Sequence, residues 1–279
     1  MAEALAQSGL HNDADSRPAC RASDPDTSAP LWAALSPVGC RGTAIGSPSS
    51  TSFSANSIIQ LEIEATISST AGALTCRLNG STTPILTFTG NTQMSVNSYA
   101  SRLVLGVVPN SSIDVYCSDI IMFDTNGSAP NSWLGNKRVL TLAPTADSAT
   151  AGLNAFSTTP TRATGSHYLN VNTEPVNTSD FNFSPTSGQR ESYQNGGLPP
   201  AVNNVTLVNV WAMMEIDNAS PHTAAITARS NGVDSVGPAI NVAQSFTYYN
   251  QPFPVDPNTG NPWLNAAVGA AEFGVELLS

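Results

Sequence analysis

Alternation of apolar and polar residues is the feature that most restricts how this chain can fold. Residues 59–67 are apolar at every odd position and polar at every even one, and residues 74–78 alternate again. A period of two is typical of half-buried β-strands. Asn79-Gly80 is a strong hairpin signal before a returning strand at 84–90. Further strands at 101–106 and 113–123 complete a series with the turn spacing of an antiparallel β-sandwich.

The second half of the chain repeats this pattern after a stretch rich in Thr, Asn, Ser and Pro at 143–200. The strands that we expect there are 205–216, 223–230, 246–249, 253–255 and 273–278. One helix is predicted over 261–271, with Pro262 in its first turn. The predicted fold is all-β, with two tandem antiparallel β-sandwich units of jelly-roll type and one short C-terminal helix.

Three segments are expected along the chain. Residues 1–42 show no sustained period and are predicted to be an irregular N-terminal arm, residues 43–136 the first sandwich, and residues 137–279 the second.

Low charge narrows the classes of function. The chain has 279 residues with 10 Lys+Arg against 20 Asp+Glu, a net charge of −10, and its only lysine is Lys137. Ser, Thr and Asn number 34, 27 and 25, so uncharged groups form most of the polar surface. Clustered cations that bind nucleic acid or anionic membranes are missing, and no apolar run has the length of a membrane helix. We therefore expect neither a nucleic acid nor a membrane as partner.

Three motifs, in order along the chain, resemble those of a family of tailed-phage and prophage virion structural proteins. The first runs from Leu61–Ile67 through Gly72, Leu74, Arg77-Leu78-Asn79-Gly80 and Leu86–Gly90 to a closing segment at 118–127, and is similar to the core of the family's concanavalin-like jelly-roll domain. The second is the junction Trp133-Leu134-Gly135-Asn136-Lys137-Arg138-Val139. The third runs from Asp256-Pro257-Asn258-Thr259-Gly260-Asn261-Pro262-Trp263 through residues 271–276.

This resemblance implies a virion protein without enzymatic activity, a tail fibre or tail-tip component that acts in assembly and host-surface attachment. The alternatives are a head spike or decoration protein, a glycan-binding lectin module and, less favoured, a glycoside hydrolase. The implied partners are other virion proteins, further copies of the chain with a trimer favoured, and a host surface glycan. The family's upstream strands are not visible in residues 1–42, so the first jelly roll is expected to be incomplete or completed by a neighbouring chain.

Catalytic patterns are weak. Glu62 and Glu64 share the polar face of one strand, as carboxylates of a glycosidase would, but the surrounding pattern of such an enzyme is missing. We interpret them as a solvated outer face and expect no catalytic residue. His11, His167 and His222 have no neighbouring nucleophile or carboxylate motif.

Aromatic residues supply the candidate binding site. Trp211, Tyr248, Tyr249 and Trp263 could offer sugar-stacking surfaces, because amphipathic rings bind pyranose faces. We expect Trp263 in the core and Trp211 on the face opposite to Val210. One of the adjacent Tyr248 and Tyr249 must point outward.

Cysteine spacing excludes a common zinc motif, and we expect no metal and no cofactor. Cys76 and Cys117 lie at apolar positions of their strands, where buried free thiols are expected, and a disulfide between them is the alternative if those strands are neighbours. The run 124–127 matches the start of a calcium loop without its bidentate glutamate, which favours a turn.

Overall fold

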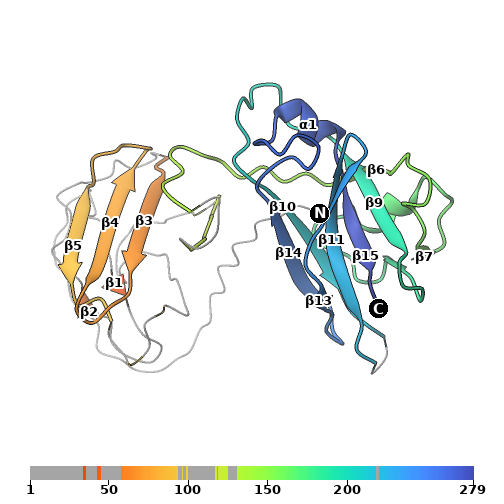
Figure 1. The fold of residues 1–279 in the computed structure, drawn as a ribbon, viewed down its shortest axis with the longest axis horizontal. Helices are drawn as coiled ribbons and strands as arrows, with labels where there is room; N and C mark the ends of the chain where they lie inside the picture. The colour runs from red at the N-terminus through yellow and green to blue at the C-terminus, as the bar shows by residue number, and fades with distance from the viewer. Residues whose placement is uncertain are drawn as a thin grey trace, which may run out of the picture. The chain divides into compact units, whose positions relative to one another are not determined.

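The computed structural model describes residues 34–35, 43–44, 58–93, 96, 99, 117, 119–124, 131–217 and 220–279 (Figure 1). Contacts divide them into two units. The N-terminal unit contains the described residues up to Asp119 together with Trp133–Arg138. The C-terminal unit contains those of Ile120–Ser132 and of Val139–Ser279.

A three-stranded antiparallel sheet is the larger of the two sheets in the described part of the N-terminal unit. Its order is β3 (Leu61–Thr66), β4 (Gly72–Leu78) and β5 (Leu86–Gly90). Asn79 and Gly80 have φ values of 51° and 71°, and Ser81 N donates to Leu78 O across this turn at 2.8 Å. Both positive φ values suit the Asn-Gly pair, which explains why β4 ends at Leu78. A separate pair joins β1 (Ala34–Leu35) to β2 (Thr43–Ala44).

One face of this sheet is apolar, as the alternation predicts. Leu74, Cys76 and Leu86 are buried on it, and Leu61 and Phe88 pack beside them. The strand predicted at 101–106 lies outside the described residues. The strand predicted at 113–123 is wrong in its described C-terminal part, because residues 119–124 belong to no strand and Asp119 has a φ of 54°, outside the extended region. The jelly-roll arrangement of this unit stays a prediction.

A six-stranded antiparallel sheet is the largest element of the C-terminal unit. Along it lie β12 (Val233–Val236), β11 (Thr223–Ser230), β15 (Glu272–Leu277), β9 (Arg190–Asn195) and β6 (Pro144–Asp147), while β13 (Ile240–Asn241) also pairs with β11. β11 has the predicted bounds, and Asn231 and Gly232, with φ values of 45° and 86°, turn the chain directly into β12. Asn-Gly again supplies the left-handed backbone that a two-residue hairpin needs.

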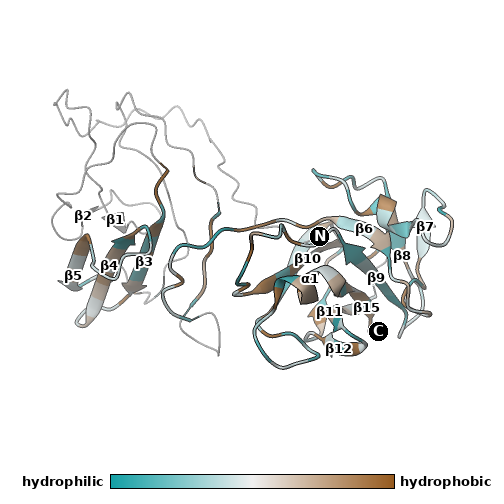
Figure 2. Cartoon of the chain, turned by 90° about the horizontal axis from the view of Figure 1, so that it is seen from above, coloured by the Kyte–Doolittle hydropathy of each residue, from teal (hydrophilic) through white to brown (hydrophobic). Residues whose placement is uncertain are grey.

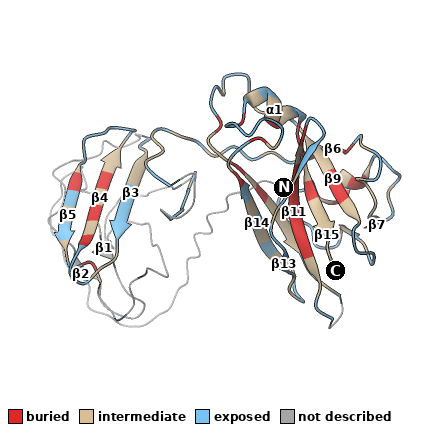
Figure 3. Cartoon of the chain, in the orientation of Figure 1, coloured by how far each residue is buried: buried red, intermediate tan, exposed pale blue. Residues whose placement is uncertain are grey.

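The second layer over this sheet is the two-stranded ribbon of β10 (Val208–Met214) and β14 (Thr247–Phe253). The buried core between them includes Val210, Ile226, Phe253 and Trp263. Figure 3 shows how buried positions concentrate along β11. The strands predicted separately at 246–249 and 253–255 form one strand, because residues 247–253 pair continuously with β10.

Beside this apolar layer, the part of the sheet made by β6 and β9 has a different cover. It consists of the pair β7 (Ser157–Thr159) and β8 (Phe181–Phe183) and of the 3-10 helix η1 (His167–Asn170). η1 contacts β6, β7 and β8. β9, with the sequence Arg-Glu-Ser-Tyr-Gln-Asn, is hydrophilic along its whole length (Figure 2). The layer under this cover is therefore polar.

The helix α1 is shorter than predicted. It spans Asn265–Ala270, so the expectation that it starts at 261 with Pro262 in its first turn is wrong. Leu264 has a ψ of 152°, and Trp263 is buried with its Nε1 donating to Phe253 O at 2.8 Å. Burying the indole requires extended backbone before the helix begins. Among the described residues no helix has the length and hydropathy needed to cross a membrane, and the all-β class is confirmed.

Candidate functional site

The predicted aromatic residues separate into two groups. Cross-strand pairing places Tyr249 opposite Ala212 on the core face of the ribbon, where its hydroxyl accepts a hydrogen bond from Ala243 N at 2.8 Å. Tyr248 points to the other face and is 39% exposed. Trp263 is 1% exposed in the core. Tyr248 therefore stays a candidate for glycan contact, whereas Tyr249 is occupied in packing.

Trp211 joins Tyr248 on the outer face, a contact that sequence reasoning did not anticipate. Val210 is buried, so Trp211 lies on the opposite face, as expected. Register pairs Met213 with Tyr248, which places Trp211 diagonally across from that ring. The two ring centroids are 6.5 Å apart, with an angle of 76° between the rings. The two residues are 37 positions apart in sequence, so their proximity depends on strand register.

Glu62 is not freely solvated, because its carboxylate binds a neighbouring backbone segment. Its Oε1 accepts hydrogen bonds from Leu134 N at 3.0 Å and Gly135 N at 2.9 Å. Arg77, opposite Glu62 on β4, stacks on Trp133, with its guanidinium carbon 4.0 Å from the ring centroid. The solvated face that we expected therefore binds the segment 133–135. Glu64 on the same face is exposed.

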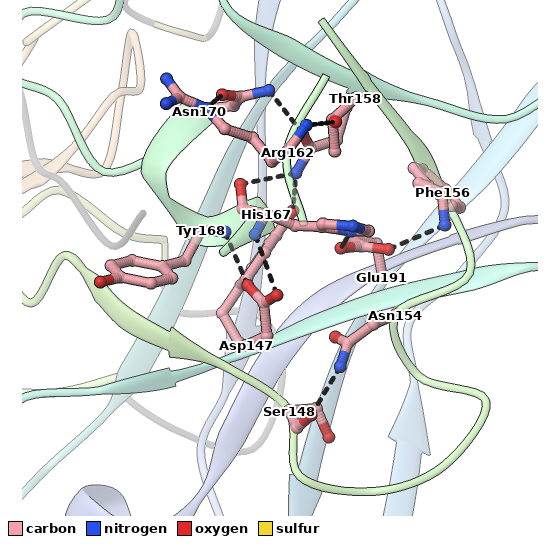
Figure 4. Close-up of polar contacts among 12 residues, drawn as sticks. Asp147, Ser148, Asn154, Phe156, Thr158, Arg162, His167, Tyr168, Asn170 and Glu191 are labelled. Atoms are coloured by element: carbon pink, nitrogen blue, oxygen red, sulfur yellow. Dashed lines mark hydrogen bonds and ion pairs between the residues drawn. The ribbon is translucent and has the colours of Figure 1, made fainter. Parts of the chain in front are cut away.

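A buried polar cluster in the C-terminal unit is a further candidate for a functional site, and the sequence pattern did not predict it (Figure 4). Glu191 on β9 is fully buried, and its Oε1 lies 2.8 Å from His167 Nδ1 at the start of η1. Its Oε2 accepts a hydrogen bond from Phe156 N at 2.9 Å. Asp147, at the end of β6, accepts from the backbone N–H groups of His167 at 2.9 Å and Tyr168 at 2.6 Å.

Asparagine side chains extend this cluster to β7 and β8. Asn170 Nδ2 donates to Thr159 O at 3.1 Å and Phe181 O at 3.2 Å, and Asn170 Oδ1 accepts from Arg162 Nε at 2.7 Å. Asn182 Nδ2 lies within hydrogen-bond distance of the Tyr193 hydroxyl, at 2.7 Å. The Asn170 contacts join η1 to β7 and β8 within the segment between β6 and β9, and the Asn182–Tyr193 contact ties that segment to the sheet.

Burial sets the protonation behaviour of the cluster. It raises the pKa of Glu191, and the nearby Asp147 charge raises it further, against the lowering effect of Phe156 N–H and His167. The pKa of the Tyr193 hydroxyl is raised well above its usual range, mainly by burial and then by the charge of Glu191. A buried carboxylate that accepts from a backbone N–H and meets a histidine is suited to hold that histidine in place.

The cluster has few properties of an active site. Among the described residues, no hydrogen bond joins His167 to a serine, threonine or cysteine side chain. A cavity of about 40 Å³, lined by residues that include Leu142, Tyr193, Val210 and Phe273, lies in this unit. Ligand sites usually enclose about 300–1,000 Å³, so this cavity is much smaller than a usual ligand site. We therefore interpret the cluster as structural.

Ion pairs cover the outer face of the six-stranded sheet. Asp234 binds Arg229 Nη1 at 2.7 Å and Arg190 Nη1 at 3.0 Å, and Arg190 also binds Glu276. Burial acts to raise the pKa of Asp234, but the hydrogen bonds and charges of the two arginines bring it below its ordinary value. Glu272 joins this network of ion pairs, with its Oε2 3.8 Å from Arg229 Nε. These charged side chains form ion pairs with one another across neighbouring strands.

The cysteines and the metal motif give no site. Cys76 and Cys117 are free thiols, so the disulfide that we allowed between them is not formed, because Cys76 packs inside the apolar cluster while Cys117 is exposed. Cys76 thus matches the expected buried thiol, and Cys117 does not.

Residues 125–127 of the calcium-like run lie outside the described residues, and within the described part no three His, Cys, Asp or Glu side chains are placed to hold a metal ion. Residues 256–260 form a turn, with Gly260 N donating to Asp256 O at 2.8 Å.

Comparisons of the chain with family models, curated proteins and solved structures found no match.

Proposed function

We propose that this chain is a non-enzymatic structural protein of a tailed-phage virion, a tail fibre or tail-tip component that acts in assembly and host-surface attachment. The observation that carries the proposal is that the side chains able to take part in acid–base chemistry form hydrogen bonds within the protein's own structure. Glu62 binds the backbone at 134–135, and His167 and Glu191 bind each other beneath η1. Side chains used in this way support a scaffold that must keep its shape outside the cell.

The surface composition supports the same role. Only 11% of the residues are charged, and the remaining polar surface consists mainly of Ser, Thr and Asn. Uncharged polar loops over a β core suit a protein that contacts other surfaces without attracting nucleic acid or anionic membranes. The sequence motifs at 61–90, 133–139 and 256–276, which resemble phage virion proteins, make the particle the favoured setting.

Unpaired strand edges support assembly into a homo-oligomer, with a trimer favoured. Within the described residues, β3 and β5 each pair on one side only, and so does β12. Exposed strand edges are sites where chains associate, and stable proteins cover them. Purified chain should elute as an oligomer in light-scattering chromatography, and a stable monomer at micromolar concentration would contradict this part of the proposal.

Localisation in the intact particle tests the proposal directly. Antibodies against the purified chain should label the tail in electron microscopy of the virion, and cryo-electron density of the tail should fit the C-terminal unit. Label on the head would favour the spike or decoration alternative, and particles that lack the chain altogether would overturn the proposal. Hydrolysis of a surface polysaccharide that is lost in Glu62→Gln would instead establish the glycosidase alternative.

A further inference from the structure

The outer face of the β10–β14 ribbon presents an uncharged aromatic surface. Cross-strand pairing brings six side chains to this face, and we name them the ribbon face: Asn209, Trp211, Met213, Tyr248, Asn250 and Pro252. The opposite face carries Val208, Val210 and Phe253, which are buried in the core. The aromatic residues of the ribbon face are therefore not required to build that core.

The two rings of the ribbon face form a corner. Their centroids are 6.5 Å apart, and an angle of 76° means that the edge of one ring meets the face of the other. The Asn209 amide is taken in the orientation that points its oxygen at neighbouring donors. In this orientation the oxygen accepts a hydrogen bond from Trp211 Nε1 at 3.0 Å. This bond holds the indole in one orientation, so a ligand would not have to immobilise it.

Charge indicates what kind of ligand fits. None of the six side chains carries a charge, and the chain as a whole has a net charge of −10. An acidic polysaccharide would meet net repulsion and no cation on the ribbon face. A neutral ligand with apolar faces and many hydroxyl groups matches rings flanked by amides.

Area favours a sugar over a protein partner. Six outward positions on two strands cover roughly 200 Å², given about 6.8 Å between alternate residues and about 4.8 Å between strands. A stable protein interface needs about 800 Å² on each partner, roughly four times as much. One or two pyranose rings match the smaller surface.

We infer that the ribbon face binds a neutral oligosaccharide, with a pyranose ring stacked in the corner of Trp211 and Tyr248. The amide of Asn250 lies opposite Trp211, with its Nδ2 3.1 Å from the Asn209 amide, so its oxygen can accept a hydrogen bond from a sugar hydroxyl beside this corner. The inference rests on the proposed role in host attachment, for which it names the ligand class. Tyr248 acts here without Tyr249, whose ring belongs to the core.

A glycan array tests this inference with the full-length chain. The array should contain neutral microbial oligosaccharides together with sialylated and uronic-acid oligosaccharides, and we expect binding to neutral members only. Isothermal titration with the best neutral oligosaccharide should then show that Trp211→Ala and Tyr248→Ala each weaken binding about tenfold or more. Because the bound ligand is neutral, the affinity should not change with salt concentration.

Matched variants separate binding from folding. Phe183→Ala removes another exposed aromatic ring, on β8, and should leave the affinity unchanged. Tyr248 is 39% exposed, so Tyr248→Ala should keep the melting temperature near that of the wild type even if Trp211→Ala does not.

The possible results distinguish the ligand from the role. No neutral glycan bound by the folded chain, or full affinity in both ribbon-face variants, overturns the inference and leaves virion localisation untouched. A change of oligomeric state in Tyr248→Ala would identify the ribbon face as a protein interface and also overturn it. Neutral-glycan binding by a chain that is missing from virions supports the inference and contradicts only the proposed function.

Discussion

Replacing Glu191 with alanine should destabilise the C-terminal unit strongly, because it removes the acceptor of two buried hydrogen bonds. Phe156 N and His167 Nδ1 lie 2.9 Å and 2.8 Å from the two carboxylate oxygens. Hydrogen bonds to charged groups contribute about 1.5–3 kcal/mol each, which gives roughly 3–6 kcal/mol for the two. Leaving each of the two donors buried without its acceptor costs about 1–3 kcal/mol, or roughly 2–6 kcal/mol in all. We therefore expect a loss of about 4 kcal/mol in the free energy of unfolding.

Calorimetry and urea unfolding of the full-length chain measure this loss. For a unit of this size, about 4 kcal/mol corresponds to a fall of roughly 10 °C in the melting temperature. Glu215→Ala is the matched control, because Glu215 is an exposed carboxylate in the same unit and its removal should change the free energy by less than about 0.5 kcal/mol. Equal effects of the two substitutions would refute the view that the buried cluster holds the segment between β6 and β9.

Glu191→Gln separates the charge from the hydrogen bonds. Burial raises the pKa of Glu191 in the folded protein, so folding favours its protonated form. The resulting stability is fully present below the unfolded pKa, at about 4.3, and is lost as the pH rises through the higher folded pKa. The wild type should therefore lose stability relative to Glu191→Gln as the pH rises from about 4 to 8. Unfolding free energies of both proteins across this range provide the test, and a difference that stays flat would contradict it.

Three further predictions concern other contacts. Glu62→Ala should destabilise the junction at 134–135 by about 1–3 kcal/mol, seen as faster hydrogen exchange of those two amides, whereas unchanged exchange would exclude the proposed contact. Gly274→Ala should lower stability by about 3 kcal/mol or more in thermal unfolding, because its Cβ would lie 2.0 Å from a backbone carbonyl oxygen of β9; a mild effect would contradict the close strand packing. In the native protein, alkylation mapped by mass spectrometry should label Cys117 and spare Cys76, whose thiol has its pKa raised by burial; equal labelling would contradict the buried position.

Local pattern predicted the strands best where it was strictly periodic. β11 has the predicted bounds, and β4 and β15 differ from their predictions by one or two residues. The Asn-Gly pair at 79–80 ended its strand as expected, and the pair at 231–232 ends β11 in the same way, because their positive φ values depend on the residues themselves. The start of α1 was missed because the burial of Trp263, a tertiary contact, keeps the preceding backbone extended.

The candidate sites were less predictable than the strands. Parity placed Trp211 opposite Val210 and required one of Tyr248 and Tyr249 to face outward, but only the register of β10 with β14 showed which tyrosine does. Glu62 was assigned to the polar face, and its bonds to 134–135 could not be predicted because that segment is 72 residues away.

The sequence by itself determined that this chain forms antiparallel strands with an uncharged polar surface, since alternation, turn residues and composition act locally. Only the tertiary structure decided where the polar groups go. Glu191 and His167 are 24 residues apart, and the order of β6 and β9 brings them together under a polar cover. Trp211 and Tyr248 meet only through strand register. Such contacts depend on which strands are neighbours, and a period of two is the same whichever neighbour a strand has.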